Sequence, residues 1–279
     1  MNEVVKYNNK LNLITFRNFL ASDCDYFMFL CYKLNEKKES TIQVTFLEIR
    51  ETVNLRNISN SELEEALLNL NDKLLATTGR IKDGSITKQF VLFNEFETDC
   101  SKQILTVSVN EKYSYILNDF SDGFTKFEFQ EFMLLSGKHS KTLYRLLKQW
   151  RTQGKYIVNV DELKRIMDCP GMETKYFMRD AVRKSIKELK AKECFKDLEV
   201  TTKRDRKPNG SLNVLTFTFA PEPTESRTNP NGATPAPAPA AETKAARKGA
   251  PAPDPRNRFN NFQQRTYDFD ELERRLQTR

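Results

Sequence analysis

Apolar side chains recur with two periods along the first 220 residues, and the order in which these periods alternate occurs twice. Helical spacing, in steps of three and four, extends over residues 19–38, and a two-residue period follows over 41–46. Two more helical stretches, 47–53 and 60–76, lie on either side of a turn. Three strands complete this half, at 77–82, 90–96 and 104–109. The pattern predicts a helix, a strand, a helix-turn-helix and a β-hairpin.

The second half predicts the same order of elements. A long helix, a strand, a short helix, a longer helix and a hairpin are expected at residues 127–153, 156–160, 161–167, 174–192 and 195–219. Five apolar positions of the first half match five of the second at one offset of 114 residues: Val44 with Val158, Phe46 with Val160, Ile49 with Leu163, Val53 with Met167 and Leu63 with Phe177. The expected fold class is α+β, a tandem pair of winged-helix domains, each with a β-hairpin wing.

Composition divides the chain further. The sequence NDFSDG at 118–123 breaks both periods, which predicts an N-terminal domain over 1–122 and a C-terminal domain over 123–220. Residues 221–256 are rich in Pro and Ala and are expected to form a disordered linker. Residues 257–279 again carry large apolar side chains, which predicts a docking peptide whose contacts come from Phe259, Phe262, Tyr267, Phe269 and Leu272.

Charge and composition exclude several functions. The net charge of +7 and the pI near 9.0 favour an anionic partner, either nucleic acid or an acidic membrane face. No apolar run approaches the roughly 20 residues of a membrane span, so a soluble, cytoplasmic protein without a membrane partner is expected. Five scattered cysteines and one histidine provide neither a disulfide framework nor the usual metal or triad sets. We expect no metal, no cofactor and no enzymatic activity.

One short motif points weakly to phosphate binding. Residues 136–140, SGKHS, resemble the end of a P-loop, but the glycine required five positions before Gly137 is replaced by Phe132. The segment also lies within a helical pattern. We interpret the match as a coincidence.

The clearest functional pattern is a basic stripe on the helix over 174–192. Lys175, Arg179, Arg183, Lys187 and Lys190 recur at steps of four, four, four and three, opposite an apolar stripe. Such a stripe is often only a solvated surface. Its place in a helix-turn-helix, with basic residues in the hairpin that follows, favours a DNA-reading helix instead. The hairpin residues are Lys203, Arg204, Arg206 and Lys207.

Residue chemistry divides the expected DNA contacts. Arg179 and Arg183 suit guanine edges, because a guanidinium can donate to O6 and N7 together. Phosphates better suit the lysines of this helix, Lys175, Lys184 and Lys187. A further stripe on the preceding long helix is expected to contact backbone phosphates: Lys141, Arg145, Lys148, Arg151 and Lys155.

The equivalent helix of the first domain has the opposite charge. Residues 60–76 hold four acidic side chains and only one basic side chain, which would repel a phosphate backbone. Two interpretations remain: this domain makes fewer and more selective DNA contacts, or it mainly contacts protein. We favour a secondary DNA contact combined with dimerisation. Arg50, Arg56 and Asn60 could reach a groove, and Lys73, Arg80 and Lys82 could reach phosphates.

Several segments resemble initiator replication proteins of iteron-carrying, theta-replicating bacterial plasmids. They are VKYNNKLN at 5–12, FRNF at 16–19, residues 109–119 and SKTLYRLLKQWRTQGK at 140–155. The resemblance implies two winged-helix domains, of which the second holds directly repeated origin sites more strongly. It also implies that monomers start replication, that dimers bind an inverted repeat and repress their own gene, and that the host initiator and the replicative helicase or its loader are recruited.

Two other functions fit parts of the pattern. A dedicated transcriptional repressor or partition adaptor could use the same fold. A scaffold protein with basic surfaces would bind DNA without sequence preference.

Overall fold

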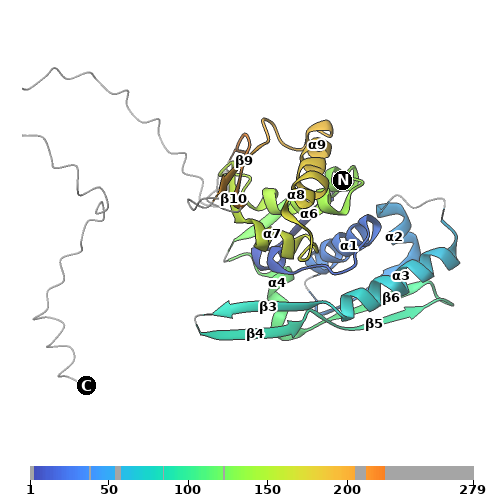
Figure 1. The fold of residues 1–279 in the computed structure, drawn as a ribbon. Helices are drawn as coiled ribbons and strands as arrows, with labels where there is room; N and C mark the ends of the chain where they lie inside the picture. Colours follow the sequence, from blue (N-terminus) through green and yellow to red (C-terminus); the bar gives the residue numbers. More distant parts are fainter. Residues whose placement is uncertain are drawn as a thin grey trace, which may run out of the picture. The chain divides into compact units, whose positions relative to one another are not determined.

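Each half of the chain folds as a winged helix, and both halves use one order of elements (Figure 1). The structure is a computed structural model that describes residues 3–37, 39–53, 58–83, 85–121, 123–204 and 212–223. The predicted α+β class and the tandem pair of winged helices are therefore confirmed. Of the predicted linker, residues 221–223 are described, and Glu222 is not free there, because it pairs with Lys148 and Arg151. The rest of the linker and the docking peptide, with Phe259, Phe262, Tyr267, Phe269 and Leu272, lie outside the described residues.

The first winged helix is built on α1 (Ala21–Lys37), and its helix-turn-helix is α2 (Phe46–Thr52) and α3 (Asn60–Leu75). Thr45 and Ser59 each begin one of these helices with a capping box, which satisfies backbone N–H groups that a helix start leaves open. The antiparallel sheet has the order β2-β6-β5, with strands Thr41–Thr45, Ile104–Val109 and Phe93–Asp99. Its wing is the β5–β6 hairpin.

The second winged helix follows the same plan. It comprises α6 (Lys138–Gln149), β8 (Lys155–Asn159), α7 (Val160–Ile166), a long helical run, β9 (Glu199–Arg204) and β10 (Leu212–Thr218). The long run consists of α8 (Thr174–Tyr176), the π-helix η3 (Phe177–Arg183) and α9 (Lys184–Ala191). The sheet order is β8-β10-β9, in which β10 pairs antiparallel with both neighbours.

The predicted repeat is visible in three dimensions. Phe46 and Val160 are the first residues of α2 and α7. Leu63 is the fourth residue of α3, and Phe177 is the fourth residue of the helical run that begins with α8. All ten side chains of the five matched pairs are buried. The common offset of 114 residues therefore aligns two equivalent cores.

The predicted strand at 77–82 is confirmed as β3 (Thr78–Asp83), but three other features differ from the prediction. β3 pairs with β4 (Ile86–Val91) in a separate ribbon inserted before the wing, and the predicted strand at 90–96 is divided between the end of β4 and the start of β5. The helix expected over 127–153 is divided into β7 (Phe124–Glu128), α5 (Phe129–Met133) and α6, because Gly137 adopts an extended backbone. Strand β1 (Val4–Asn8), which was not predicted, pairs with β7.

A short connection joins the wing of the first winged helix to β7. It contains η2 (Glu111–Tyr113) and α4 (Tyr115–Asn118), while η1 (Asn9–Leu13) follows β1. The β1–β7 pair therefore links the start of the chain to the start of the second half, across the predicted boundary at 122/123. That boundary stays a prediction.

Candidate nucleic-acid interface

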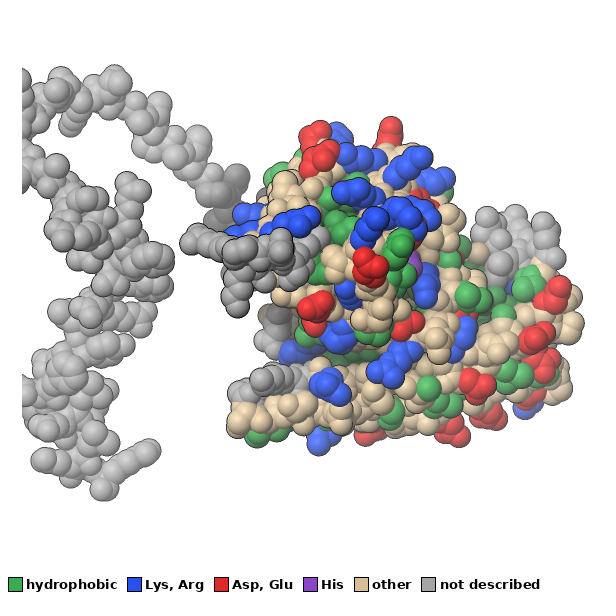
Figure 2. Space-filling model, in the orientation of Figure 1, with side chains coloured by type: hydrophobic (Ala, Val, Ile, Leu, Met, Phe, Trp, Pro, Cys, Tyr) green, Lys and Arg blue, Asp and Glu red, His purple; other side chains and the backbone are tan. Residues whose placement is uncertain are grey.

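The basic stripe of the second winged helix is exposed along the whole run from α8 to α9. Its inward side is fixed by Phe177, Val182 and Leu189, which are buried in the core. In Figure 2 lysine and arginine side chains gather over these helices. The exposed cations of the run are Lys175, Arg179, Arg183, Lys184, Lys187 and Lys190. The predicted division into a basic outer side and an apolar inner side is confirmed.

The π-helix η3 explains why the stripe has four-residue steps. In an α-helix each four-residue step overshoots one turn by about 40°, so a stripe with three such steps would drift around the axis. The turns of a π-helix are wider, because the hydrogen bonds run from i to i+5. Since η3 spans Phe177–Arg183, the step from Arg179 to Arg183 lies within wide turns and does not add to the drift of the α-helical steps on either side.

The same π-helix adds one residue relative to α3. Leu67 and Ala181 are both buried and still differ by 114, but after η3 the buried residues match at 115: Leu70 with Ser185, and Leu74 with Leu189. The helical run of the second domain therefore contains one extra residue, and the wide turns accommodate it without turning the later residues out of the core.

Two of the exposed cations are paired within the helix. Arg179 Nη2 lies 2.7 Å from Asp180 Oδ2, and Lys184 Nζ lies 3.0 Å from Asp180 Oδ1. Hydrogen bonds from Arg179 and then Lys184 lower the pKa of Asp180 to about 2, so its carboxylate stays charged near neutral pH. Arg179 also lies over the ring of Tyr176, 5.0 Å from its centroid. These contacts orient Arg179 before any ligand is present.

The other cations of the stripe differ in their ion-pair partners. Lys175, Arg183 and Lys187 form no ion pair with any residue in the described part of the chain. Lys190 Nζ lies 2.5 Å from Glu199 Oε1 at the start of β9 and so joins the helix to the wing. On the wing Lys203 and Arg204 are exposed, whereas Arg206 and Lys207 lie outside the described residues.

The predicted phosphate-contacting stripe on α6 was wrong. Lys141, Arg145 and Lys148 are only 1%, 2% and 7% exposed, because α1, the N-terminal segment and residue 222 cover them. Lys141 Nζ lies 2.6 Å from Asp25 Oδ1, and Lys148 Nζ lies 2.8 Å from Glu222 Oε1.

Arg145 and Arg151 have internal partners as well. Arg145 donates to the carbonyls of Leu11 and Ile14 and to Asn12 Oδ1, at 3.2, 3.3 and 3.0 Å. Arg151 is partly buried, with Nε 3.4 Å from Glu222 Oε2. These four side chains hold the N-terminal segment and the end of the second winged helix, and the three buried ones cannot reach a duplex.

The segment at 136–140 also has a structural role. Glu188 of α9 accepts hydrogen bonds from the backbone N and the Oγ of Ser136, at 2.5 and 2.8 Å, just before α6 begins. Burial opposes the charged carboxylate, but hydrogen bonds from Ser140 and Ser136 outweigh it and lower the pKa of Glu188. An internal carboxylate therefore occupies the helix N-terminus at which a phosphate would bind in a P-loop.

The residues expected to contact DNA in the first winged helix are less well placed. Asn60, the first residue of α3, is exposed, but its Oδ1 accepts from Arg50 Nη2 at 2.6 Å. Arg56 lies outside the described residues. Arg50, in the last turn of α2, also donates to the carbonyl of Ile58 and so holds the start of α3. Its two bonds give it a structural role beside the groove contact that the sequence predicts for it.

Within the described residues, no three His, Cys, Asp or Glu side chains are grouped so that they could hold a metal ion. None of the described helices is both long and apolar enough to cross a bilayer.

An exposed basic helix followed by a basic hairpin is the arrangement with which winged helices bind duplex DNA.

Comparisons with known proteins agree with this geometry. A family model described as "Initiator Replication protein, WH1" matches residues 4–148, which is more than half of the chain, and one described as "Initiator Rep protein, WH2" matches residues 159–219. The chain belongs to this family of initiator replication proteins. The WH1 match begins at β1 and continues through most of α6, so it includes the β1–β7 pair.

Two similar members illustrate how far the likeness extends. "Probable replication protein rep" of Bifidobacterium longum (strain NCC 2705) is 36% identical over 168 residues, 60% of this chain and 57% of that protein. The chain thus spans less than two thirds of this relative's length. The crystal structure of Pi initiator protein in complex with iteron DNA has a TM-score of 0.58 at 18% identity, covering 79% of this chain and 98% of that one. That likeness shows a shared fold.

Proposed function

We propose that this initiator binds duplex DNA sequence-specifically at repeated sites (iterons) in a plasmid origin and recruits host replication machinery there, without catalysing a reaction itself. The observation that carries the proposal is the exposed stripe of Lys175, Arg179, Arg183 and Lys187 on the helix that a winged helix places in a major groove. Membership of the family and the iteron DNA bound by the Pi initiator support the same function.

The roles of the basic residues follow from their surroundings. Arg183, which has no ion pair among the described residues, suits a guanine edge, and Arg179, which Asp180 holds in orientation, suits a second one. Lys175, Lys184 and Lys187, with Lys203 and Arg204 on the wing, suit phosphates. We extend the wing contact to Arg206 and Lys207 and assign a secondary contact to Arg56 and Asn60.

Footprinting with the full chain on DNA that flanks its gene tests the proposal. We expect protection of tandem repeats beside an AT-rich tract, with affinity that falls by about three to five decades between 50 and 200 mM salt if six to ten phosphates are neutralised. Protection of a single operator without repeats would favour a transcriptional repressor or partition adaptor. Binding without sequence preference would contradict both functions.

Regulation and recruitment extend the proposal. We assign residues 1–122 to dimerisation and a secondary DNA contact, 123–220 to the main DNA contact, and a dimer to repression of the chain's own gene. Residues 257–279 would dock on the host initiator, the replicative helicase or its loader. Deleting 257–279 should abolish plasmid replication and leave origin binding in a gel shift unchanged; loss of both activities would refute the docking role.

A further inference from the structure

Tyr176 is a large aromatic side chain exposed in the first turn of the DNA-reading run. It is the last residue of α8 and is 43% exposed, whereas the next residue, Phe177, is buried in the core. Its hydroxyl forms no hydrogen bond with any residue in the described ranges. Residues near the N-terminus of such a helix are those that contact base edges in a major groove. The ring therefore adds little to the core and lies where a duplex would be read.

Asp180 binds one edge of the neighbouring Arg179 guanidinium group and leaves another edge open. Arg179 Nε lies 3.1 Å from each carboxylate oxygen of Asp180, and Nη2 lies 2.7 Å from Oδ2. These bonds occupy the edge formed by Nε and Nη2. The edge formed by Nη1 and Nη2 has no partner in the described part of the chain, and the side chain is 62% exposed. Its two N–H groups match O6 and N7 of guanine.

The ring of Tyr176 lies against one face of this guanidinium group. Cζ of Arg179 lies over the ring, 5.0 Å from its centroid. A guanidinium that donates to O6 and N7 lies close to the plane of the guanine, and the next base of the strand is about 3.4 Å away along the duplex axis. A ring stacked on the guanidinium therefore lies at the level of the neighbouring base pair. Tyr176 and Arg179 together span two successive base pairs.

We propose that Tyr176 contacts the C5-methyl group of a thymine next to the guanine that Arg179 reads, so that the two side chains recognise one two-base-pair step. This inference rests on the proposed function, because it requires the run to lie in a major groove. The thymine methyl is the apolar group that a base pair presents on this edge. The other groups there are hydrogen-bond donors and acceptors, which an aromatic ring would desolvate without replacing their bonds.

Two other roles of Tyr176 would have different effects. If its hydroxyl donated to a phosphate, Tyr176→Phe would weaken binding and the neighbouring base would not matter. If the ring only positioned Arg179, its loss would reduce recognition of the guanine and leave the thymine methyl without effect. Asp180 already orients Arg179 through three hydrogen bonds, so the ring is not needed for that purpose.

Replacing thymine with deoxyuridine tests the contact, because it removes the methyl group and keeps every hydrogen-bonding group of the base. In gel shifts of the full chain, each thymine of a cognate repeat is replaced in turn. Affinity should fall about threefold to fivefold at a thymine next to the guanine at which Arg179→Ala reduces discrimination. At that position Tyr176→Ala should bind the thymine and deoxyuridine repeats equally well, whereas Tyr176→Phe should keep the wild-type ratio of the two affinities.

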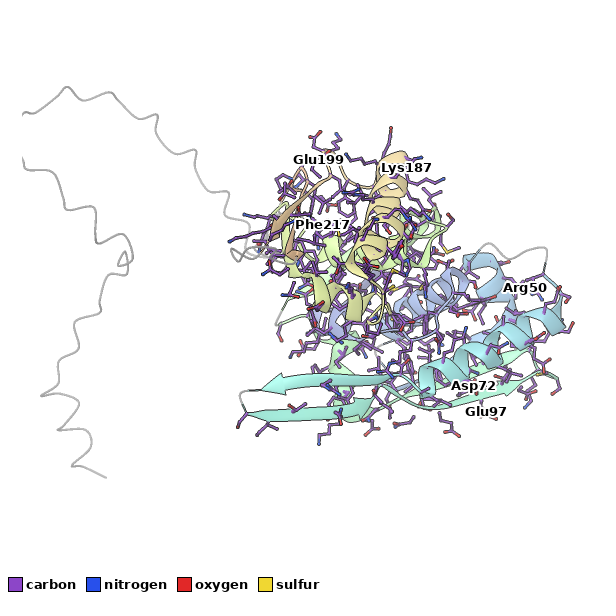
Figure 3. All side chains as sticks on the ribbon, in the orientation of Figure 1. Arg50, Asp72, Glu97, Lys187, Glu199 and Phe217 are labelled. Atoms are coloured by element: carbon purple, nitrogen blue, oxygen red, sulfur yellow. The ribbon has the colours of Figure 1, made fainter. Side chains whose placement is uncertain are left out.

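Lys187→Ala is the matched control on the same stripe. Figure 3 labels Lys187 on α9, well beyond Tyr176 along the run. Its loss should weaken binding to the thymine and deoxyuridine repeats alike, so the ratio of the two affinities should stay as in wild type. A changed ratio would show that the methyl effect is not specific to Tyr176 and would count against the proposal.

The remaining outcomes separate this contact from the proposed function. Wild type that prefers the repeat but binds thymine and deoxyuridine equally at every position next to that guanine would overturn the contact alone. Retention of the thymine preference by Tyr176→Ala, or its loss in Tyr176→Phe, would do the same. Wild type without any preference for the repeat over random-sequence DNA would refute the proposed function, and the contact with it.

Discussion

Arg145 donates a hydrogen bond of 3.0 Å to Oδ1 of Asn12, a residue 133 positions earlier in the chain. The bond joins α6 of the second winged helix to η1, and Asn12 in turn donates to Thr125 Oγ1 and Gln149 Oε1, both at 2.9 Å. The Arg145 guanidinium is fully enclosed and bonds to carbonyl and amide oxygens, with no carboxylate partner in the described ranges. The two winged helices are thus tied by a buried cation.

Replacing Arg145 should affect stability and leave DNA contacts unchanged. Arg145→Met removes three buried hydrogen bonds, including the one to the carbonyl of Ile14, while the Leu11 carbonyl keeps the Ile14 N–H, so the free energy of unfolding should fall by about 2–4 kcal/mol in urea. Arg183→Met, on the exposed stripe, should change it by less than about 0.5 kcal/mol. The salt dependence of DNA binding, measured where both variants are folded, should decrease only for Arg183→Met. The opposite pattern would return Arg145 to the phosphate contacts.

Arg183 and Lys187 should differ in what they recognise. Arg183→Ala should weaken binding to the cognate repeat by about 1–3 kcal/mol and reduce discrimination at one base pair. Lys187→Ala should weaken binding to all duplexes alike and reduce the slope of log affinity against log salt by about 0.9. Competition gel shifts on single-base variants of the repeat measure both effects. A uniform loss for Arg183→Ala would identify it as a phosphate contact.

Asp180 should restrain DNA affinity. Asp180→Asn removes a negative charge from the basic stripe and releases Arg179 and Lys184, so binding to any duplex should tighten by about threefold to tenfold near 50 mM salt, and less at higher salt. The ratio of cognate to random-sequence affinity should fall, because Arg179 loses its fixed orientation. Glu39→Gln, the same charge change on a distant exposed residue, should alter neither quantity. Weaker binding by Asp180→Asn would show that Asp180 serves only to position Arg179.

Asp25 should make stability depend on pH. Burial raises its pKa to about 6, although the Lys141 ammonium 2.6 Å away opposes the shift. The folded state therefore holds the proton more tightly than the unfolded chain, where an aspartate titrates near 3.9. The stabilisation from this proton is complete below about pH 4 and is lost as the pH rises through about 6. In urea titrations from pH 4 to 7, Asp25→Asn should remove this component, whereas Glu39→Gln should retain it; equal slopes for wild type and Asp25→Asn would contradict the shift.

The repeat and the DNA-reading helix could be predicted because both depend on local periods. Phe177, Val182 and Leu189 recur at helical spacing and bury one side, which leaves the cations of that helix outside. The burial of Arg145 could not be predicted from the spacing of the basic residues on α6, because a row of basic residues has the same spacing whether another segment covers it or solvent does.

Contacts between residues distant in the sequence account for the other differences between the predicted and the observed fold. Val4 pairs with Glu128 in the β1–β7 ladder, and nothing within either segment specifies its partner. The inserted β3–β4 ribbon shifted the first wing relative to the second, so strand boundaries copied from one half could not be transferred to the other. The reach of Glu222 back to Lys148 likewise depends on where the second sheet ends.

The π-helix has a consequence for how a groove-reading helix can vary in length. Gaining one codon inside an ordinary α-helix rotates everything beyond it by about 100°, which would point Lys187 and Lys190 away from the duplex. Here the wide turns between Phe177 and Arg183 accommodate the additional residue, and Leu189 stays buried in the core. Deleting Asp180 alone should therefore be tolerated by the fold, and the distance along the groove between Arg179 and Lys187 becomes a quantity that insertions and deletions can tune.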